Sequence, residues 1–384
     1  MSGPVPQIPG IKCEPALAEE FRKEVAELLH RRQSSFPGAQ PVSFARHHLD
    51  ELQKRDYYLC EKTDGIRCLL YCTEDERGNE IHYLIDRKND YYFLQTLHFP
   101  HQDDPEFREF HRGTLIDGEL VNDTLENGRK QLRYLVFDCI VLDGELLLQK
   151  PLDKRIGRFG EFVFKPYQKF LKRYTDALGT MPFEVKFKTM EKPYGIEMMF
   201  RDKLPNLPHG NDGLVFTCKE TPYVMGTDDH ILKWKPAHEN SIDFRLRLGE
   251  FPLMSSSDPR EGRIPDYDAK PTFELYVYHG GKDYQSYAPL FVTDDDWESM
   301  KRIDEPIDGR IIECYKAEQG RWRFKRESDG SPRFRDDKSD ANHISTVHKV
   351  MQSIDDAVSE QDLLQVAGAV YKAWKQRHPE ELRR

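Results

Sequence analysis

A lysine at the end of an apolar run is the residue whose surroundings most directly suggest chemistry. The hexapeptide KTDGIR at 62–67 lies between two apolar stretches of the segment 57–71. A lysine at a strand end, followed by a turn built on Asp-Gly, would be held at a fixed place beside a sheet. Burial and neighbouring cations would lower the pKa of Lys62 from its reference value of about 10.4, toward the neutral amine that a nucleophile requires.

The same hexapeptide, taken alone, is also typical of a plain turn. Asp-Gly is a common hairpin dipeptide, and the chain has six of them, beginning at Asp64, Asp117, Asp143, Asp212, Asp308 and Asp329. The default interpretation of each is a hairpin turn. A catalytic interpretation of Lys62 therefore needs further signals elsewhere in the chain.

A pair of lysines near the middle of the chain provides one such signal. Lys233 and Lys235 flank Trp234 in the segment LKWKP at 232–236. On a strand, alternate side chains share a face, so both ammonium groups would point to one side and Trp234 to the other. Two neighbouring cations repel each other and would not stabilise a fold, but they could bind a phosphate group. If they lay beside Lys62, they would lower its pKa by like-charge repulsion.

Length and composition limit the class of protein. A chain of 384 residues fits two compact domains, and a hydrophobic content of 38% argues against wholesale disorder. The net charge of −10 argues against extensive non-specific binding of nucleic acid. No apolar run approaches the roughly 18 residues of a bilayer helix, and the first residues lack a signal-peptide pattern. We therefore expect a soluble intracellular protein without a membrane partner.

The cysteines point to a reducing compartment. The chain has seven cysteines, an odd number, and none of them forms a CxxC pair. Several, such as Cys68 and Cys139, lie inside apolar, strand-like runs. We expect buried free thiols rather than disulfides or a cysteine zinc site.

Apolar periodicity predicts an α+β fold in the first two thirds of the chain. A helix is expected over 16–32 and another over 161–178. Strands are expected twice within 57–71 and at 82–86, 115–121, 132–142, 213–218 and 231–234. Because turns separate most of these strands, a largely antiparallel sheet is expected.

The pattern changes after Pro236. Short alternating strands at 242–248, 273–278, 310–316 and 321–326 indicate a small β-barrel. The polar segment 237–241 is a candidate hinge. Beyond Lys338 the chain becomes helical, and an apolar stripe comprises Val358, Leu363 or Leu364, Val366, Val370 and Trp374.

The order of several motifs resembles that of the eukaryotic mRNA guanylyltransferases, or capping enzymes, most closely the stand-alone fungal type. These enzymes belong to the covalent nucleotidyltransferases, which include ATP-dependent DNA and RNA ligases. The motifs are KTDGIR at 62–67, IDR at 85–87, IDGEL at 116–120, LVFDC at 135–139, NDGLVF at 211–216, LKWKP at 232–236 and RDDK at 335–338. The similarity extends from about residue 40 to Lys338.

This resemblance implies a domain organisation. A nucleotidyltransferase domain with antiparallel sheets, of the ATP-grasp-like kind, is expected over 1–240. An OB-fold β-barrel is expected over 241–345. The remaining segment, 346–384, is expected to be helical and to pack on the large domain.

The resemblance also implies roles for individual residues. Lys62 would attack the α-phosphorus of GTP, form a lysyl-N-GMP intermediate and release pyrophosphate. Further catalytic residues would be Lys233 and Lys235 at the α-phosphate, and Arg335 and Lys338 at the β- and γ-phosphates. The nucleotide-binding set would comprise Thr63, Asp64, Arg67, Arg87, Glu119, Phe137, Lys188, Asp212 and Asp337.

Within that set, the resemblance gives more specific contacts. Arg67 and Glu119 would bind ribose hydroxyls, and Phe137 would lie against the guanine. Glu119 and Asp212 would help to hold Mg²⁺ or Mn²⁺, because hard cations take carboxylate oxygens alongside phosphate. Arg87 would contact a phosphate or the base, and Lys188 would approach the base.

The implied function is mRNA capping, in which GMP passes from GTP to the 5′-diphosphate end of RNA. The chain contains no HCxxGxxR phosphatase loop, so a separate RNA triphosphatase is expected. By family analogy, the phosphorylated tail of RNA polymerase II would recruit the enzyme in the nucleus. Two alternatives remain open here: an ATP-dependent polynucleotide ligase of the same superfamily, and a non-catalytic scaffold for RNA or polymerase.

Overall fold

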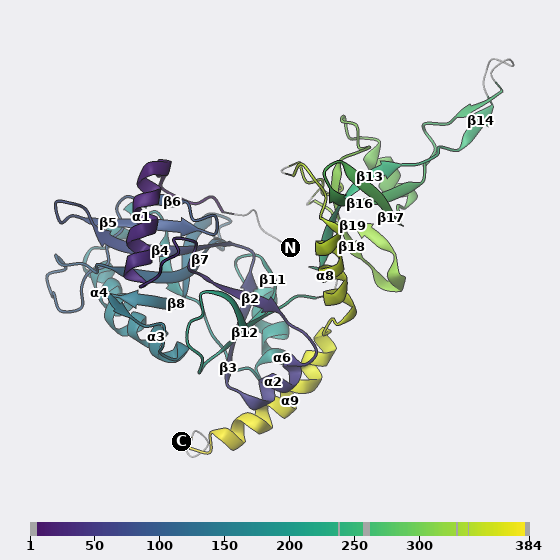
Figure 1. The fold of residues 1–384 in the computed structure, drawn as a ribbon. Helices are drawn as coiled ribbons and strands as arrows, with labels where there is room; N and C mark the ends of the chain where they lie inside the picture. Colours follow the sequence, from purple (N-terminus) through teal and green to yellow (C-terminus); the bar gives the residue numbers. More distant parts are fainter. Residues whose placement is uncertain (1–5, 237–238, 256–261, 328, 337, 381–384) are drawn as a thin grey trace. The chain divides into compact units, whose positions relative to one another are not determined.

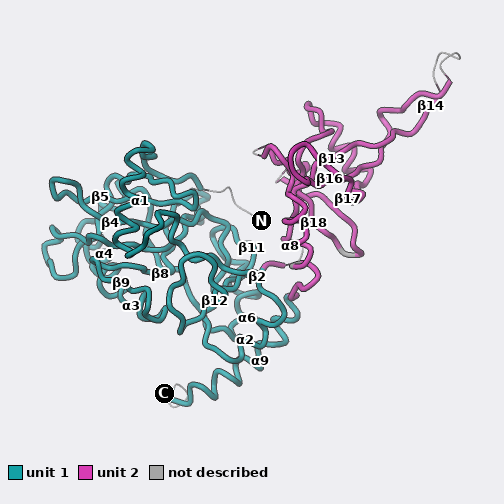
Figure 2. Tube along the Cα trace, viewed as in Figure 1, with its two compact units in different colours: residues 1–234, 360–384 teal, residues 235–359 magenta. Residues whose placement is uncertain are grey.

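The chain forms two compact units, each with its own apolar core. The computed structural model describes residues 6–236, 239–255, 262–327, 329–336 and 338–380 (Figure 1). Unit 1 comprises Met1–Trp234 and Glu360–Arg384, and unit 2 comprises Lys235–Ser359 (Figure 2). Unit 1 therefore also includes the C-terminal part of the chain.

Two sheets form the framework of unit 1. The larger has the order β1-β6-β5-β4-β7-β8-β10, with β9 paired to β8, and the smaller has the order β2-β12-β11-β3. The larger sheet contains β1 (Ile11–Lys12), β4 (Ile66–Glu74), β5 (Glu80–Asp86), β6 (Tyr91–Leu94), β7 (Thr114–Thr124), β8 (Lys130–Leu142), β9 (Glu145–Leu146) and β10 (Glu184–Phe187). The smaller contains β2 (Ala39–Ser43), β3 (Tyr57–Thr63), β11 (Asn211–Cys218) and β12 (Gly226–Trp234). Most pairs are antiparallel, as predicted, and β8–β10 and β2–β12 are parallel.

The helices of unit 1 are α1 (Pro15–Leu28), α2 (His48–Lys54), α3 (Leu152–Arg158), the π-helix η1 (Phe159–Phe164), α4 (Lys165–Arg173), α5 (Ala177–Thr180), α6 (Ile196–Met198), η2 (Met199–Lys203), the 3₁₀-helix η3 (Leu204–Asn206) and α9 (Glu360–Arg377). Of these, α1 lies in the core on one face of the larger sheet, and η1 and α4 lie in the core on the other face. On β4, Leu69 shares a core with Val25 of α1, whereas Leu70 shares a core with Phe159 and Val163. Strand β4 is therefore a continuous apolar run, because neighbouring side chains enter opposite cores.

The helical segment after residue 343 divides between the units. Helix α8 (Ile344–Asp355) belongs to unit 2, and Val347 of α8 is buried in that unit's core. Helix α9 belongs to unit 1 and buries Leu363, Val370 and Trp374, three members of the predicted stripe. The Nε of Arg377 donates to the Asp56 carboxylate at 3.0 Å, so α9 is bound by both apolar and ionic contacts.

Unit 2 is built on a five-stranded antiparallel sheet of order β17-β16-β13-β18-β19. Its strands are β13 (Ser241–Leu248), β16 (Phe273–Gly280), β17 (Asp283–Pro289), β18 (Ile311–Lys316) and β19 (Trp322–Phe324). A separate hairpin pairs β14 (Leu253–Ser255) with β15 (Arg263–Pro265), and the unit also contains α7 (Asp294–Met300) and the 3₁₀ turn η5 (Glu318–Gly320). The backbone N–H of Phe291, just beyond β17, donates to the carbonyl of Trp322 in β19 at 2.9 Å. Because this contact joins the two sheet edges, the strands form a partly closed barrel, which is a feature of OB-folds.

The Asp-Gly dipeptides do not all form turns. Asp143 and Gly144, with φ of 48° and 76°, form the tight turn between β8 and β9 as predicted. The turn interpretation is wrong for Asp117, which lies inside β7 and is fully buried, and for Asp212, which lies in β11. Both of these aspartates instead place a carboxylate beside a cation of the candidate site.

The cysteines and the surface match the composition. All seven cysteines are free, and all except the half-buried Cys13 are buried. Burial raises the pKa of the Cys60 thiol to about 12.

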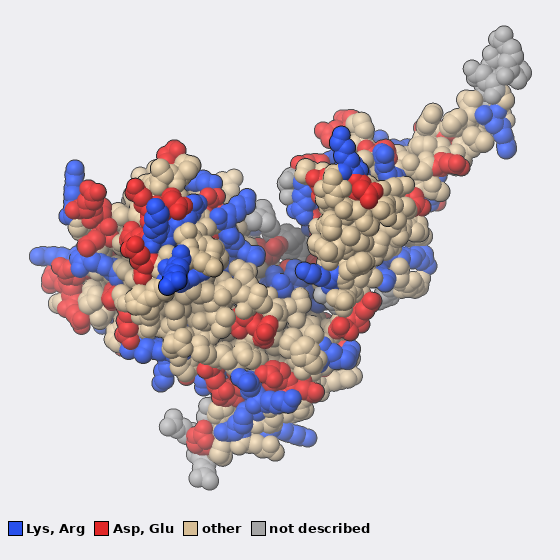
Figure 3. Space-filling view, in the orientation of Figure 1, with Lys and Arg blue, Asp and Glu red and all other residues tan. Residues whose placement is uncertain are grey.

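On the face shown in Figure 3, acidic and basic side chains are interspersed in both units. Among the described residues, no helix is long and apolar enough to cross a membrane.

Candidate active site around Lys62

Lys62 lies near the end of β3, beside an irregularity in the neighbouring strand. Thr63 pairs with Asn211 and Glu61 pairs with Leu214, so β11 carries an extra residue in a bulge at this point. The bulge brings the Asp212 Oδ1 to 2.6 Å from the Lys62 Nζ. The two side chains are 23% and 18% exposed. The amine is therefore fixed in position but open to a ligand.

Strand pairing places Lys233 on the same sheet face as Lys62. Lys233 pairs with Val215, and Val215 pairs with Cys60, two residues before Lys62. Directly paired residues share a face, as do alternate residues of a strand. The two lysines are separated by two strand spacings, or about 10 Å across the sheet. Lys235 directly follows β12, while Trp234 points into the protein with 3% of its surface exposed.

The opposite face of β3 carries a buried polar cluster. The Lys188 Nζ, just beyond β10, donates to the Thr63 hydroxyl at 2.6 Å and lies 3.5 Å from a Glu119 carboxylate oxygen. The Thr63 hydroxyl also donates to Glu119. Glu61 lies 3.7 Å from the same ammonium group. We call Glu61, Thr63, Glu119 and Lys188 the inner cluster.

The inner cluster is charged in spite of its burial. Burial lowers the pKa of Lys188, but Glu119 and Glu61 more than offset that effect, and the net pKa is raised. Burial raises the pKa of Glu61, but Lys188 and His209 outweigh it, and the net pKa is lowered. Lys188 and Glu61 are therefore each stabilised in the ionised form by oppositely charged neighbours.

Arg67 is held by a carboxylate inside the larger sheet. Its Nε donates to the Asp117 Oδ1 at 3.0 Å and its Nη2 donates to the Asp117 Oδ2 at 2.6 Å, while Nη1 donates to the carbonyl of Ala39. The Tyr223 hydroxyl donates to the same Asp117 carboxylate at 2.7 Å and accepts from the Ala39 N–H at 2.9 Å. Burial lowers the pKa of Arg67, but Asp117 more than compensates and raises it overall. The guanidinium is therefore fixed on two sides.

Three more predicted residues lie close to Arg67 along the strands. Glu119 of β7 pairs directly with Arg67 of β4, so their side chains share a face. Phe137 lies at a bulge of β8, since Asp117 pairs with Asp138 whereas Gly118 pairs with Val136. The Phe137 ring lies 5.5 Å from the Arg67 guanidinium carbon. The exposed Arg87 donates to the Gln40 side chain at 3.1 Å, one residue from the Ala39 carbonyl that Arg67 contacts.

The remaining predicted residues are in other places. Asp64 lies in the bend after β3, where its backbone N–H donates to the carbonyl of Gly210 at 2.9 Å. Arg335 and Lys338 belong to unit 2, and both contact the buried carboxylate of Asp243 there, Arg335 at 3.4 Å. Asp337 lies outside the described residues.

Sequence reasoning missed several residues that hold the site together. Asp117 and Tyr223 fix Arg67, Glu61 balances Lys188, and Asp243 pairs with the cations of unit 2. Asp117 was visible inside the motif IDGEL at 116–120, and Tyr223 lies nine residues before the motif LKWKP at 232–236. Neither segment shows that the two side chains meet.

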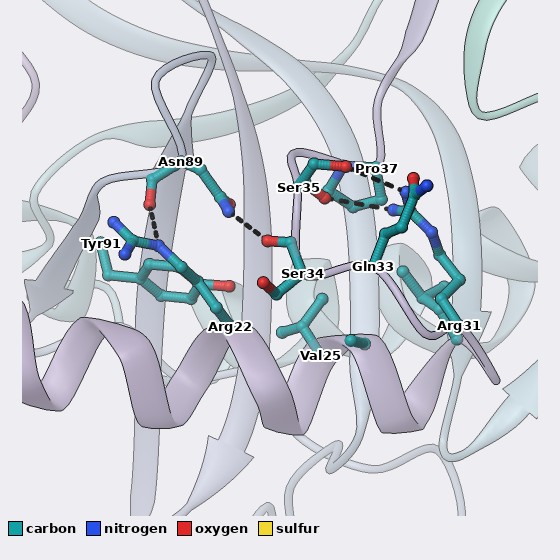
Figure 4. A pocket seen from close by; sticks show the side chains of 11 residues that line it. Arg22, Val25, Arg31, Gln33, Ser34, Ser35, Pro37, Asn89 and Tyr91 are labelled. Carbon is teal, nitrogen blue, oxygen red and sulfur yellow. Dashed lines mark hydrogen bonds between the residues drawn. The ribbon is translucent and has the colours of Figure 1, made fainter.

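The polar groups that line a separate recess in unit 1 hydrogen-bond to one another. The recess lies between α1, the segment 31–37 and the turn at Asn89 (Figure 4). Asn89 accepts from the Arg22 Nε at 3.0 Å and donates to the Ser34 carbonyl at 2.6 Å. These bonds attach the segment after α1 to the sheet, and they use the polar groups that a ligand would need.

Comparison with known proteins identifies the family. The model of the mRNA capping enzyme catalytic domain matches residues 5–237, and that of the mRNA capping enzyme C-terminal domain matches residues 239–364. The chain belongs to the mRNA-capping enzyme family. Membership makes it an enzyme, a nucleotidyltransferase of mRNA capping, and places the Lys62 site in the catalytic domain.

Curated relatives extend the match over nearly the whole chain. The mRNA-capping enzyme subunit alpha of Neurospora crassa is 51% identical over 391 residues, covering 97% of this chain and 95% of that protein. The corresponding proteins of Schizosaccharomyces pombe and Saccharomyces cerevisiae are 44% and 36% identical, covering 96% and 97% of this chain and 89% and 87% of those proteins. Among solved structures, mycobacterial DNA ligase D covers 78% of this chain and 95% of that chain at 13% identity, with a TM-score of 0.35.

Proposed function

We propose that this capping enzyme transfers GMP from GTP to the 5′-diphosphate end of RNA through a covalent bond to Lys62. The contact between the Lys62 Nζ and the Asp212 carboxylate, at 2.6 Å, carries the proposal. It fixes an accessible amine at a strand end and provides an adjacent proton acceptor. These are the two requirements of a nitrogen nucleophile that begins as an ammonium group.

The reaction would run in two balanced steps. In the first, Lys62 Nζ passes a proton to Asp212 and attacks the α-phosphorus of GTP. The N–P bond forms, the bond from the α-phosphorus to the bridging oxygen breaks, and pyrophosphate leaves with the second proton that the nitrogen gives up. In the second, a terminal phosphate oxygen of the RNA attacks the same phosphorus, the N–P bond breaks, and Lys62 regains one proton from Asp212 and one from water. Strand β3 holds the nitrogen at one place throughout both steps.

The groups around Arg67 fit the nucleoside part of GTP. Arg67 and Glu119 share a face of the larger sheet and would bind the ribose hydroxyls. Phe137, turned out of β8 by its bulge, would lie against the guanine. Arg87 and Asp64 complete this side of the proposed site, with Thr63 and Lys188 behind Glu119.

A divalent cation, Mg²⁺ or Mn²⁺, fits the donor set beside Lys62. Both ions favour carboxylate oxygens together with phosphate. Asp212 is the better candidate ligand because it lies on the accessible face, whereas Glu119 is already bonded to Thr63 and lies beside Lys188. When bound, the cation would neutralise developing charge on the phosphate oxygens.

Further cations would serve the triphosphate. Lys233 and Lys235 are proposed to bind the α-phosphate, and Arg335 and Lys338 the departing pyrophosphate, with Asp337 contributing from the same motif. We also propose a nuclear location, a separate RNA triphosphatase that supplies the diphosphate end, and recruitment by the phosphorylated tail of RNA polymerase II. These proposals rest on family membership.

Labelling with nucleotide tests the function directly. Incubating the purified chain with α-labelled GTP and a divalent cation should give an acid-labile adduct, and peptide mass spectrometry should place GMP on Lys62. Labelled ATP is the control, because an AMP adduct would support a ligase activity instead. RNA with a 5′-diphosphate end should discharge the adduct, whereas 5′-monophosphate RNA should not. Failure to form any nucleotide adduct would instead support the alternative of a non-catalytic scaffold.

A further inference from the structure

A cluster in unit 1 that is separate from the Lys62 site combines two histidines with an aspartate. His101 and His111 come from the segment before β7, and Asp143 comes from the turn between β8 and β9. One nitrogen or oxygen of each residue lies within 4.8 Å of the others. His111 is fully buried, whereas the side chains of His101 and Asp143 are 27% and 33% exposed. The cluster is thus preformed but reachable from solvent.

The hydrogen-bond pattern of His111 leaves one nitrogen facing the carboxylate. Its Nε2 lies 3.1 Å from the carbonyl of Phe162, and its Nδ1 lies 2.9 and 3.0 Å from the two carboxylate oxygens of Asp143. All of these partners are acceptors, and a neutral imidazole has only one N–H. If that hydrogen serves Phe162, the lone pair of Nδ1 faces the carboxylate, and a cation between them is required.

The position of His101 favours a metal ion over a proton as that cation. The His101 Nε2 lies 3.7 Å from the Asp143 Oδ2, which is too long for a hydrogen bond. Zinc bonds of 2.0 to 2.2 Å in a tetrahedral site place neighbouring ligand atoms about 3.4 Å apart. The distances to the Asp143 carboxylate, 2.9 Å from His111 and 3.7 Å from His101, lie on both sides of that value, and the three ligand atoms together lie within 4.8 Å of one another. A proton between His111 and Asp143 would not account for the approach of the His101 Nε2 to the same carboxylate.

The surroundings resemble the outer shell of a metal site. A histidine that binds metal usually donates its other ring N–H to a backbone carbonyl or carboxylate, and His111 has the Phe162 carbonyl in that place. The backbone N–H of Arg112 donates to the Asp143 Oδ1 at 3.3 Å, which orients the carboxylate. The Gln102 Nε2 lies 3.2 Å from the His101 Nε2, and the Gln102 Oε1 is buried without a hydrogen-bond partner. Half a turn of that amide would offer its oxygen as a fourth ligand.

We propose that His101, His111 and Asp143 bind one transition-metal ion, with zinc the best match to two imidazoles and a carboxylate. Imidazole nitrogen favours zinc, copper, nickel or cobalt, whereas the oxygen donors beside Lys62 favour magnesium or manganese. The ion would attach the segment before β7 to the β8–β9 turn at the margin of the larger sheet. The role is structural, and it does not depend on GMP transfer.

Titration of the tag-free, chelator-treated full chain with zinc chloride tests this site. Calorimetry should detect one equivalent of zinc binding with micromolar or tighter affinity, and the unfolding temperature should rise by about 3 °C or more. Magnesium in excess should not compete. Cobalt in place of zinc should show the strong visible absorption of a tetrahedral site.

Substitutions decide whether these residues are the ligands. Asp143→Asn suits the left-handed turn, where φ is 48°, and His101→Asn changes a partly exposed ring, so both should fold. Each should weaken zinc binding at least 10-fold. His98→Asn, which breaks a nearby histidine–glutamate pair, and Asp212→Asn at the Lys62 site should leave zinc binding unchanged. The proposal is overturned if the wild type binds no stoichiometric zinc, or if either ligand variant binds it as tightly as the wild type.

Discussion

The two faces of β3 carry charged groups in very different surroundings. On one face, Lys62 contacts Asp212, and both side chains remain about one fifth exposed, at 23% and 18%. On the other face, Lys188 contacts Thr63 and two carboxylates, and its side chain is only 4% exposed. Consecutive residues of one strand thus serve an accessible ion pair and a buried network.

The difference in exposure between the two faces suggests that one serves the reaction and the other holds the strand in place. An ion pair that keeps contact with solvent contributes less to stability than a buried one, so it can exchange partners during a reaction at a smaller cost. A buried network is costly to disrupt, because each remaining charge would be left without a partner. We therefore expect substitutions on the Lys62 face to affect activity, and substitutions in the inner cluster to affect stability first.

Lys62→Ala should produce the largest effect on activity with little effect on folding. Loss of the nucleophile should reduce GMP labelling at least about 1,000-fold. The free energy of unfolding should change by less than about 1 kcal/mol, because Asp212 remains hydrated. Labelling assays and urea denaturation measure the two quantities.

Lys154→Ala provides the matched control for that variant, because this lysine is exposed in α3. It should keep both labelling and stability. Persistent labelling of Lys62→Ala at the wild-type rate would disprove the assignment of the nucleophile, and global unfolding of the variant would contradict the proposed division between the two faces.

Lys188→Met should produce the largest effect on stability. Methionine preserves most of the volume but leaves Glu61 and Glu119 buried without their cation, and the expected loss is about 3 to 5 kcal/mol. Lys186→Met is the control, because Lys186 lies two residues earlier with a side chain that is 41% exposed. It should change the free energy of unfolding by less than about 1 kcal/mol. Equal effects of the two variants in urea denaturation would show that the inner cluster does not stabilise the fold.

Local patterns predicted the elements that bear the site. Alternation and apolar runs gave the strands on both sides of KTDGIR, and the spacing of Lys233 and Trp234 gave their opposite faces. Those features depend on the two-residue repeat of a strand, which can be recognised from the types of neighbouring residues. The family membership inferred from the order of motifs is confirmed by the two family models.

Partners across strands were not predictable in the same way. Lys62 was expected beside cations, but the neighbour that its side chain contacts is Asp212, brought there by a bulge in β11. Asp117 lies in the predicted strand 115–121, although its Asp-Gly dipeptide also favours a turn, and neither pattern shows that its buried carboxylate binds Arg67. Both outcomes depend on which strands pair and in which register. A single sequence does not specify that pairing.

Tyr223→Phe extends the comparison to the larger sheet with a smaller expected effect. The Tyr223 hydroxyl donates to Asp117 and accepts from the Ala39 N–H. Its loss should therefore lower the free energy of unfolding by about 1 to 2 kcal/mol. Because Arg67 would lose part of its support, the KM for GTP should rise and discrimination against 3′-deoxy-GTP should weaken, while the labelling rate at saturation stays close to that of the wild type. Tyr174→Phe, at a tyrosine that is 44% exposed, is the control. If Tyr223→Phe matches that control in both stability and KM, the hydroxyl does not position Arg67.

The smallest expected effect concerns the acid stability of the inner cluster. Lys188 and His209 outweigh burial and lower the pKa of Glu61 below its ordinary value of 4.5. A carboxylate whose pKa is lower in the folded state stabilises the protein above pH 4.5, and this contribution disappears as the pH falls through the folded-state pKa. The difference in unfolding free energy between wild type and Glu61→Gln should therefore be constant near neutrality and should narrow below pH 4.5. Urea denaturation at a series of pH values measures it, with the exposed Glu20→Gln as the control. A difference that does not vary with pH would mean that Glu61 gains no ionic stabilisation from Lys188, and the buried face of β3 would then be held by packing alone.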